Sequence, residues 1–173
     1  NAPMKQNLDN LNRCSQQQFI EILGGIFEHS PWVAELVFAQ RPFASDDQLY
    51  RIMVDEVRRA PQWQRMDLLC QHPELAGKEA SAGTLTQSSK SEQAGAGLDQ
   101  CSAEELARIK QLNRDYRERF GFPFIIAVTG LNKHQIIDAM QQRLQFEEAD
   151  EFDLALTEVE KIARIRLNAL LDG

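Results

Sequence analysis

The 173-residue chain is 43% hydrophobic and 26% charged, which is typical of a globular protein that buries a core without disulfides or metals. Its formal net charge of −7 argues against nucleic-acid binding, which needs a basic face, and against docking on an anionic membrane. No apolar run approaches the ~20 residues of a membrane span. Cys14, Cys70 and Cys101 form no CxxC pair, which favours buried or unreactive thiols in a reducing cytosol over a redox or zinc role.

Four sites combine a capping side chain with a reciprocal partner three residues later, the pattern that opens a helix. These pairs are Ser15 with Gln18, Ser45 with Gln48, Ser102 with Glu105, and Asn132 with Gln135. Residues 102–120 form the clearest predicted helix, because apolar side chains recur on one face and Gly121 follows as a stop. Further helices are expected over 88–96, with Gly97 as the cap, and over about 150–171.

Two stretches lack helical periodicity. Residues 77–87 are rich in small and polar residues and predict a loop. Residues 122–128 are apolar, begin with Phe-Pro, and predict a buried extended segment that is too isolated to imply a sheet. The expected fold is therefore all-α, a single compact multi-helix domain with one short buried extended segment near 122–128.

The extended segment raises a question about its backbone. Without a sheet partner, its buried N–H and C=O groups must be satisfied by some other group. A polar, planar ligand is one candidate, and ordinary packing beneath a helix is the other.

His72 is the first candidate for chemistry. Pro73 disfavours helical dihedrals at His72 and stiffens the turn that carries it. A histidine exchanges a proton near neutral pH, so His72 is a candidate general acid or base, with a helix-end or surface histidine as the alternative. His29 and His134 are weaker candidates, and the absence of HxxxH or HExxH spacing argues against a metal site.

Ser89, Glu92 and Gln93 are spaced i, i+3 and i+4, so their side chains share one side of a helix. The residues that follow, 94–97, are alanines and glycines, which cover little and allow the polar trio to face a cavity. A solvated surface helix is the alternative. Two glycines in three positions argue against it, because each costs up to about 1 kcal/mol in a helix relative to alanine.

The last helix presents an arginine on its apolar face. At about 100° per residue, the predicted buried stripe consists of Leu156, Val159, Ala163 and Leu170. Arg166 points almost the same way, whereas Arg164 points toward solvent. A buried arginine needs an anionic partner, which is Glu92, another carboxylate of the core, or a substrate anion. The alternative is that Arg166 extends from the edge of the stripe to water.

Four sequence blocks together resemble one family. They are His-Pro-Glu-Leu-Ala-Gly at 72–77, Ser-Lys-Ser-Glu-Gln-Ala-Gly-Ala-Gly-Leu at 89–98, Phe-Gly-Phe-Pro-Phe-Ile at 120–125, and Glu-Val-Glu-Lys-Ile-Ala-Arg-Ile-Arg-Leu at 158–167. In this order they resemble 2-oxo-4-hydroxy-4-carboxy-5-ureidoimidazoline (OHCU) decarboxylases. The resemblance extends from about residue 11 to residue 171.

The resemblance implies an all-helical, cofactor-free and usually homodimeric enzyme. Members of the family act after urate oxidation and 5-hydroxyisourate hydrolysis, and they convert OHCU into (S)-allantoin with loss of CO2. Matching residues one at a time, the resemblance makes His72 catalytic, with Glu92 orienting it or sharing its proton. It assigns substrate binding to Pro73, Ser89, Gln93, Phe124, Ile125, Ile126, Ala127 and Arg166.

The expected boundaries follow from Asn-Ala-Pro at residues 1–3, which resembles a remnant of tag cleavage before Met4, and from the extent of the resemblance. Residues 1–10 are expected to be a tag remnant and an N-terminal tail, and 11–173 an OHCU decarboxylase-like helical domain. The C-terminal Leu-Asp-Gly is not a peroxisomal address, which fits a bacterial, cytoplasmic member. The competing functions are a non-enzymatic helical interaction module and a cofactor-free hydrolase or tautomerase acting on a related ureide.

Overall fold

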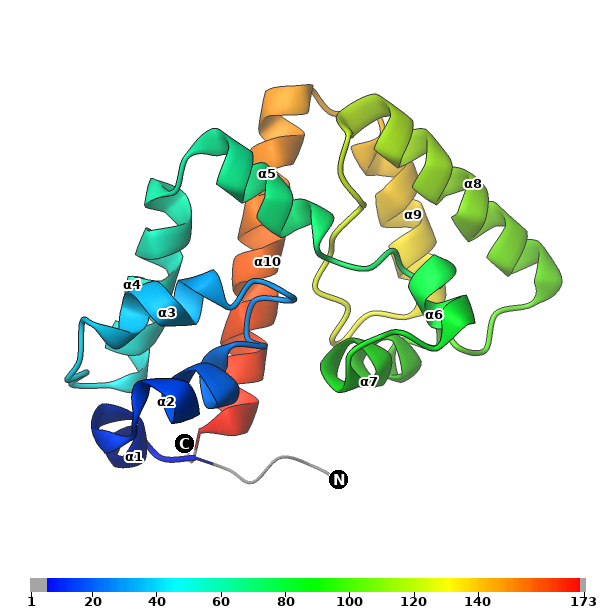
Figure 1. The fold of residues 1–173 in the computed structure, drawn as a ribbon. Helices are drawn as coiled ribbons and strands as arrows, with labels where there is room; N and C mark the ends of the chain where they lie inside the picture. The colour runs from blue at the N-terminus through cyan, green and yellow to red at the C-terminus, as the bar shows by residue number, and fades with distance from the viewer. Residues whose placement is uncertain (1–5, 172–173) are drawn as a thin grey trace. The chain divides into compact units, whose positions relative to one another are not determined.

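A computed structural model describes residues 6–171, and within this range the chain forms ten helices and no strand (Figure 1). The all-α prediction is confirmed. The expected tag remnant at residues 1–3 lies outside the described residues. Contacts divide the chain into two compact units. The first unit contains the described residues up to Gln71 and those from Glu160 onward, and the second unit is His72–Val159.

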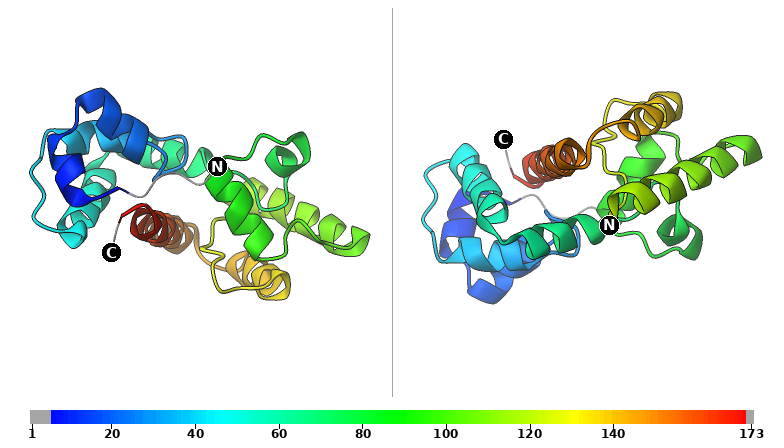
Figure 2. Two further views of the ribbon diagram at one scale, coloured as in Figure 1. Left: turned by 90° about the horizontal axis from the view of Figure 1, so that it is seen from below. Right: turned by 90° about the horizontal axis from the view of Figure 1, so that it is seen from above.

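Five helices and the end of the last helix make up the first unit. They are α1 (Leu8–Arg13), α2 (Gln16–Leu23), α3 (Trp32–Phe38), α4 (Asp46–Arg59), α5 (Gln62–Cys70) and the part of α10 (Glu148–Leu170) from Glu160. Helix α3 packs against both α2 and α4, and both views in Figure 2 show these three helices gathered together. Phe19 lies at the centre, with its ring 5.4 Å from that of Phe38 and 6.1 Å from that of Phe43.

The second unit contains α6 (Lys78–Ala82), α7 (Gln87–Gly95), α8 (Ala103–Phe120), α9 (Lys133–Arg143) and the beginning of α10. Helices α8 and α9 pack together. An aromatic cluster forms the core, with the ring of Tyr116 within 4.6–5.7 Å of the rings of Phe120, Phe122 and Phe124. Every aromatic residue of this cluster is buried.

All four predicted helix starts are confirmed. Ser15, Ser45, Ser102 and Asn132 are N-caps whose side chains accept from the backbone N–H three residues later. The reciprocal bond is present at three of them. At the fourth, Gln48 accepts from the N–H of Ala44 at 2.6 Å instead of that of Ser45. The predicted cap at Gly97 is also present, with φ at +80° after α7.

Two stretches differ from the expected elements. The prediction of a loop over 77–87 is wrong at 78–82, where α6 forms from Lys-Glu-Ala-Ser-Ala and ends at Gly83 with φ at +72°. Lysine, glutamate and alanine are good helix formers, and a single turn needs no apolar periodicity. At the N-terminal side, α1 begins at Leu8, and the N–H of Gln6 donates to the C=O of Leu170 at 2.7 Å, forming an isolated bridge.

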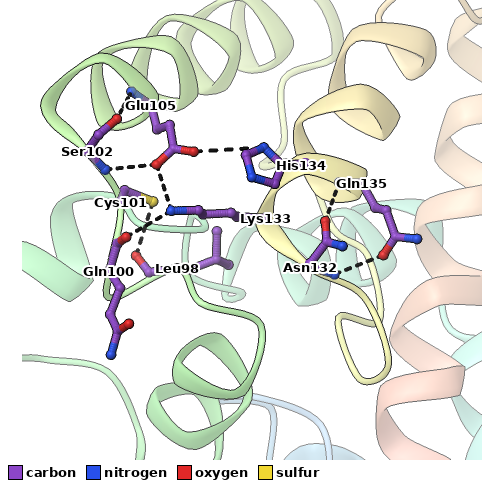
Figure 3. A network of polar contacts seen from close by, with 9 residues as sticks. All are labelled: Leu98, Gln100, Cys101, Ser102, Glu105, Asn132, Lys133, His134 and Gln135. Carbon is purple, nitrogen blue, oxygen red and sulfur yellow. Dashed lines mark hydrogen bonds and ion pairs between the residues drawn. The ribbon is translucent and has the colours of Figure 1, made fainter.

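An ion cluster joins the start of α8 to the start of α9 (Figure 3). The Lys133 ammonium donates to Glu105 Oε1 at 2.7 Å and to the C=O of Gln100 at 3.0 Å. The backbone N–H of Ser102 also donates to Glu105, at 2.9 Å. These bonds stabilise the charged carboxylate, the one from Lys133 most strongly, and hold the pKa of Glu105 at about 2.

We predict that Lys133→Met reduces the loss of stability in acid. Because the folded-state pKa of Glu105 is depressed, its contribution is complete above the unfolded pKa near 4.5 and is lost as the pH falls toward 2. The variant should be less stable at pH 6, and its unfolding free energy should fall less steeply between pH 5 and pH 2. Urea titrations across this range measure both effects. Lys110→Met, on the exposed side of α8, serves as the control and should keep the wild-type slope.

Candidate active site

His72 follows the end of α5 and is the first residue of the second unit. Its side chain is buried, with the residue 6% exposed, whereas His29 and His134 are exposed. The turn 73–77 continues from it into α6 and contains Ala76 in the left-handed region, with φ at +48°. A surface location, one of the alternatives for His72, is therefore excluded.

Gln93 holds this turn from α7. Its Oε1 accepts from the backbone N–H of Ala76 at 3.0 Å, and its Nε2 donates to the C=O of Glu74 at 3.5 Å. Gln93 and Ala76 are both buried, so the N–H of Ala76 would lack water if the carboxamide were absent, whereas Glu74 is half-buried. The amide of Gln93 can still offer one more N–H and one more lone pair.

Helix α8 holds the same turn from a second direction. The Nδ2 of Asn113 donates to the C=O of Leu75 at 3.0 Å, and the Nε of Arg117 donates to the Glu74 carboxylate at 3.2 Å. Asn113 is 4% exposed. Sequence reasoning missed both residues, although an asparagine three residues before Tyr116 on an apolar face is a signal that it faces the core.

The polar side chains of α7 are largely inside the protein. Ser89 is 4% exposed and Gln93 is 5% exposed, while Glu92 is half-buried and Ala94 and Gly95 face solvent. The backbone N–H of Ser89 is capped by the hydroxyl of Thr86 at 3.2 Å. A fully solvated helix, the alternative for this trio, is therefore excluded for Ser89 and Gln93.

The segment 122–128 is neither helix nor strand, and its buried backbone is bound by charged side chains. Arg143 Nη1 donates to the C=O of Ile125 at 2.5 Å, and the N–H of Ala127 donates to Glu158 Oε1 at 3.0 Å. Sequence reasoning missed both partners. Arg143 is three residues after Met140 and seven after Ile136, so it lies on the buried face of α9 by the same geometry that marks Arg166 on α10.

Arg166 lies inside the first unit, as the helix geometry predicts. Its Nη1 donates to Glu28 Oε1 at 2.9 Å and to the C=O of Gly25 at 3.0 Å, and its side chain is 6% exposed. The anionic partner is thus another carboxylate of the core, and extension to water is excluded. Arg164 is 33% exposed and pairs with the exposed Asp47.

The predicted site residues fall into two groups. His72, Pro73, Glu92, Ser89 and Gln93 belong to the second unit together with Phe124, Ile125, Ile126 and Ala127, and Arg166 belongs to the first. Within residues 6–171, no three histidine, cysteine or acidic side chains gather as a metal site, and no helix has the length and apolar character that a membrane crossing requires. The second unit offers an imidazole for proton transfer and polar groups for a small ligand.

The chain is an all-helical protein in which a buried histidine, His72, precedes a proline, and known proteins share both its sequence and its fold. The family model for OHCU decarboxylase matches residues 12–168, and the chain belongs to this family. It is 41% identical over 160 residues to a 2-oxo-4-hydroxy-4-carboxy-5-ureidoimidazoline decarboxylase of Haloferax volcanii, covering 92% of this chain and 93% of that protein. It is 37% identical over 161 residues to the protein of the same name in Xenopus laevis, covering 93% and 92%.

Solved structures agree in fold. A crystal structure of (S)-allantoin synthase matches with a TM-score of 0.75 and 31% identity, over 96% of this chain and 55% of that one. A crystal structure of OHCU decarboxylase in the presence of (S)-allantoin matches with a TM-score of 0.70 and 19% identity, over 92% of this chain and 100% of that one. The chain also spans 32% of a bifunctional uric acid degradation protein of Bacillus subtilis, at 42% identity.

We predict that Gln93→Met lowers the free energy of unfolding by about 1–3 kcal/mol, because methionine fills the space but leaves the buried N–H of Ala76 without its acceptor. Chemical denaturation measures the change. Gln87→Met, at the exposed start of the same helix, is the matched control and should change stability by less than about 0.5 kcal/mol. Equal losses in both variants would contradict a clamping role for Gln93.

Proposed function

We propose that this protein decarboxylates OHCU to (S)-allantoin without a cofactor, in the degradation of urate. The observation that carries the proposal is the family match over residues 12–168, together with relatives that bear this enzyme's name and match over more than nine-tenths of their length. The buried His-Pro turn supports it, because it provides one imidazole in a fixed position. A cytoplasmic homodimer is part of the same proposal.

The proposed reaction needs no external electron sink. C4 of the substrate bears a hydroxyl and a carboxylate, and the adjacent C=N accepts the electron pair when the bond from C4 to the carboxylate breaks and CO2 leaves. The pair then forms a C4=C5 bond as the C=N electrons move to nitrogen. His72 takes up the proton of the 4-hydroxyl, with Glu92 orienting the imidazole or sharing that proton. The ring nitrogen that receives the C=N electrons takes up a proton from solvent. The deprotonated oxygen on C4 then forms the C4=O bond as the electrons of C4=C5 take up a second proton at C5, and delivery of this proton to one face gives the S configuration.

The remaining residues bind and orient the substrate in this proposal. Arg166 binds oxygens of the ureido or ring carbonyl groups, since a guanidinium on the departing carboxylate would stabilise the ground state and slow the step. Its pairing with Glu28 supports this role, because the ion pair fixes the guanidinium in one orientation. Pro73, Ser89, Gln93 and the backbone of 124–127 contact the ring and ureido amides.

His72→Asn tests the proposal directly. We expect stereospecific formation of allantoin to be abolished while the helical fold is kept, because asparagine has no group that exchanges a proton near neutral pH. The assay follows circular dichroism while OHCU is made in situ from urate by urate oxidase and 5-hydroxyisourate hydrolase. His29→Asn is the control, since His29 is exposed and has φ at +50°, a conformation that asparagine tolerates.

The same assay separates the competing functions. If OHCU decays to racemic allantoin at the background rate in the presence of the wild-type protein, the protein is an interaction module. Addition of water without release of CO2 indicates a ureide hydrolase. Full stereospecific activity in His72→Asn would remove the role given to this imidazole.

Arg166→Lys tests the role in substrate binding. Lysine keeps the positive charge beside Glu28 but loses the planar fork, so the KM for OHCU should rise about tenfold or more with little change in Tm. Arg164→Lys, two residues away on the same helix and paired with an exposed carboxylate, is the control and should keep the wild-type KM. An unchanged KM in Arg166→Lys would count against substrate contact by this guanidinium.

A further inference from the structure

We propose that Arg143 and Glu158 are positioning residues for the OHCU reaction. They bind one edge of the segment 124–127 and leave the peptide groups of Ile126, on the opposite edge, to bind an amide of the substrate. This inference rests on the function proposed above. All the residues that carry it belong to the second unit. The segment lies in the connection between α8 and α9, which contains no helix (Figure 1).

A buried ion network fixes the C=O of Ile125. Arg143 donates to this carbonyl through Nη1, and its Nε donates to Glu151 Oε1 at 2.6 Å. The hydroxyl of Tyr116 donates to the same carboxylate oxygen at 2.5 Å. Exposure is 5% for Arg143 and 0% for both Glu151 and Tyr116. The guanidinium also lies 4.4 Å from the centre of the Phe124 ring, so it is held from three sides.

Glu158 fixes the next group along the same edge. Its carboxylate accepts from the N–H of Ala127 at 3.0 Å and extends from the part of α10 that belongs to the second unit. Glu158 is 6% exposed. A carboxylate that accepts from a backbone N–H makes a charge-assisted bond, which is about twice as strong as a neutral one.

The alternation of an extended chain connects these two bonds to Ile126. In such a chain, residues i and i+2 direct their C=O and N–H groups to one edge, and residue i+1 directs its own to the other. Because the C=O of Ile125 and the N–H of Ala127 are both bound by side chains, we infer that they share one edge and that the N–H and C=O of Ile126 face the opposite edge. Ile126 and Ala127 are half-buried, while Phe124, Ile125 and Val128 are buried. One donor and one acceptor side by side match the edge of a ureido or ring amide.

The chemistry of the network favours positioning over stability. Removing an arginine and a carboxylate from water is expensive, and apolar residues of similar volume are often at least as stabilising as a buried ion pair. A network of fixed charges on the backbone instead limits the segment to one conformation. An enzyme gains from this limit, because misplacing substrate-binding groups by about 1 Å costs rate.

A matched pair of variants at Glu158 provides the test. Glu158→Gln keeps an oxygen that accepts from the N–H of Ala127, and Glu158→Leu removes it at similar volume. We expect the KM for OHCU to rise about tenfold in Glu158→Leu with kcat changed less than about threefold, and to stay within about threefold of wild type in Glu158→Gln. Ile109→Val, a core variant on α8, controls for lowered stability and should lower Tm without changing KM.

Hydrogen exchange provides a readout that does not depend on activity. Exchange at the N–H of Ala127 should become faster in Glu158→Leu and remain slow in Glu158→Gln, while exchange at Met140 in the middle of α9 stays unchanged in both. A Glu158→Leu protein with wild-type KM, or equal KM values in the two variants, overturns the positioning role. A wild-type protein that does not turn over OHCU overturns the proposed function and this inference with it.

Discussion

Buried backbone outside helices must find hydrogen-bond partners, and the architecture of the second unit depends on how this demand is met. Long polar side chains from the surrounding helices supply the bonds. Gln93 and Asn113 bind the turn after His72, and Arg143 and Glu158 bind the segment between α8 and α9. In both places, the irregular chain that the proposed chemistry needs is made rigid by groups on regular elements.

The local elements of this fold follow from short sequence patterns, and the contacts between distant elements do not. The caps at Ser15, Ser102 and Asn132 were predictable because donor and acceptor are three residues apart. Helix α6 was missed because one turn carries no periodic signal. The burial of Arg166 followed from its place on a stripe, whereas its partner Glu28, 138 residues away, is fixed only by the tertiary fold.

The candidate site shows the same division. The types of residue that could transfer a proton or bind an amide were visible in the blocks around His72 and Ser89. The structure adds the supporting residues and shows that Gln93, expected to read the substrate, has both ends of its amide bonded to the turn beside His72. The sequence also left open which groups bind the buried backbone of residues 122–128. The structure shows that side chains of α9 and α10, Arg143 and Glu158, bind part of it.

Ala76, in the turn that Gln93 and Asn113 bind, shows how a fixed backbone conformation affects substitution at one residue. Holding a residue with a Cβ at φ +48° costs roughly 1–2 kcal/mol, a strain that glycine would relieve. Glycine would also give the unfolded chain more freedom, which offsets much of that relief. On balance glycine should be modestly the more stabilising residue at this place, because the strain exceeds the entropy effect. Alanine has the narrower conformational range, so it restricts the conformations open to the turn that follows His72 more than glycine would.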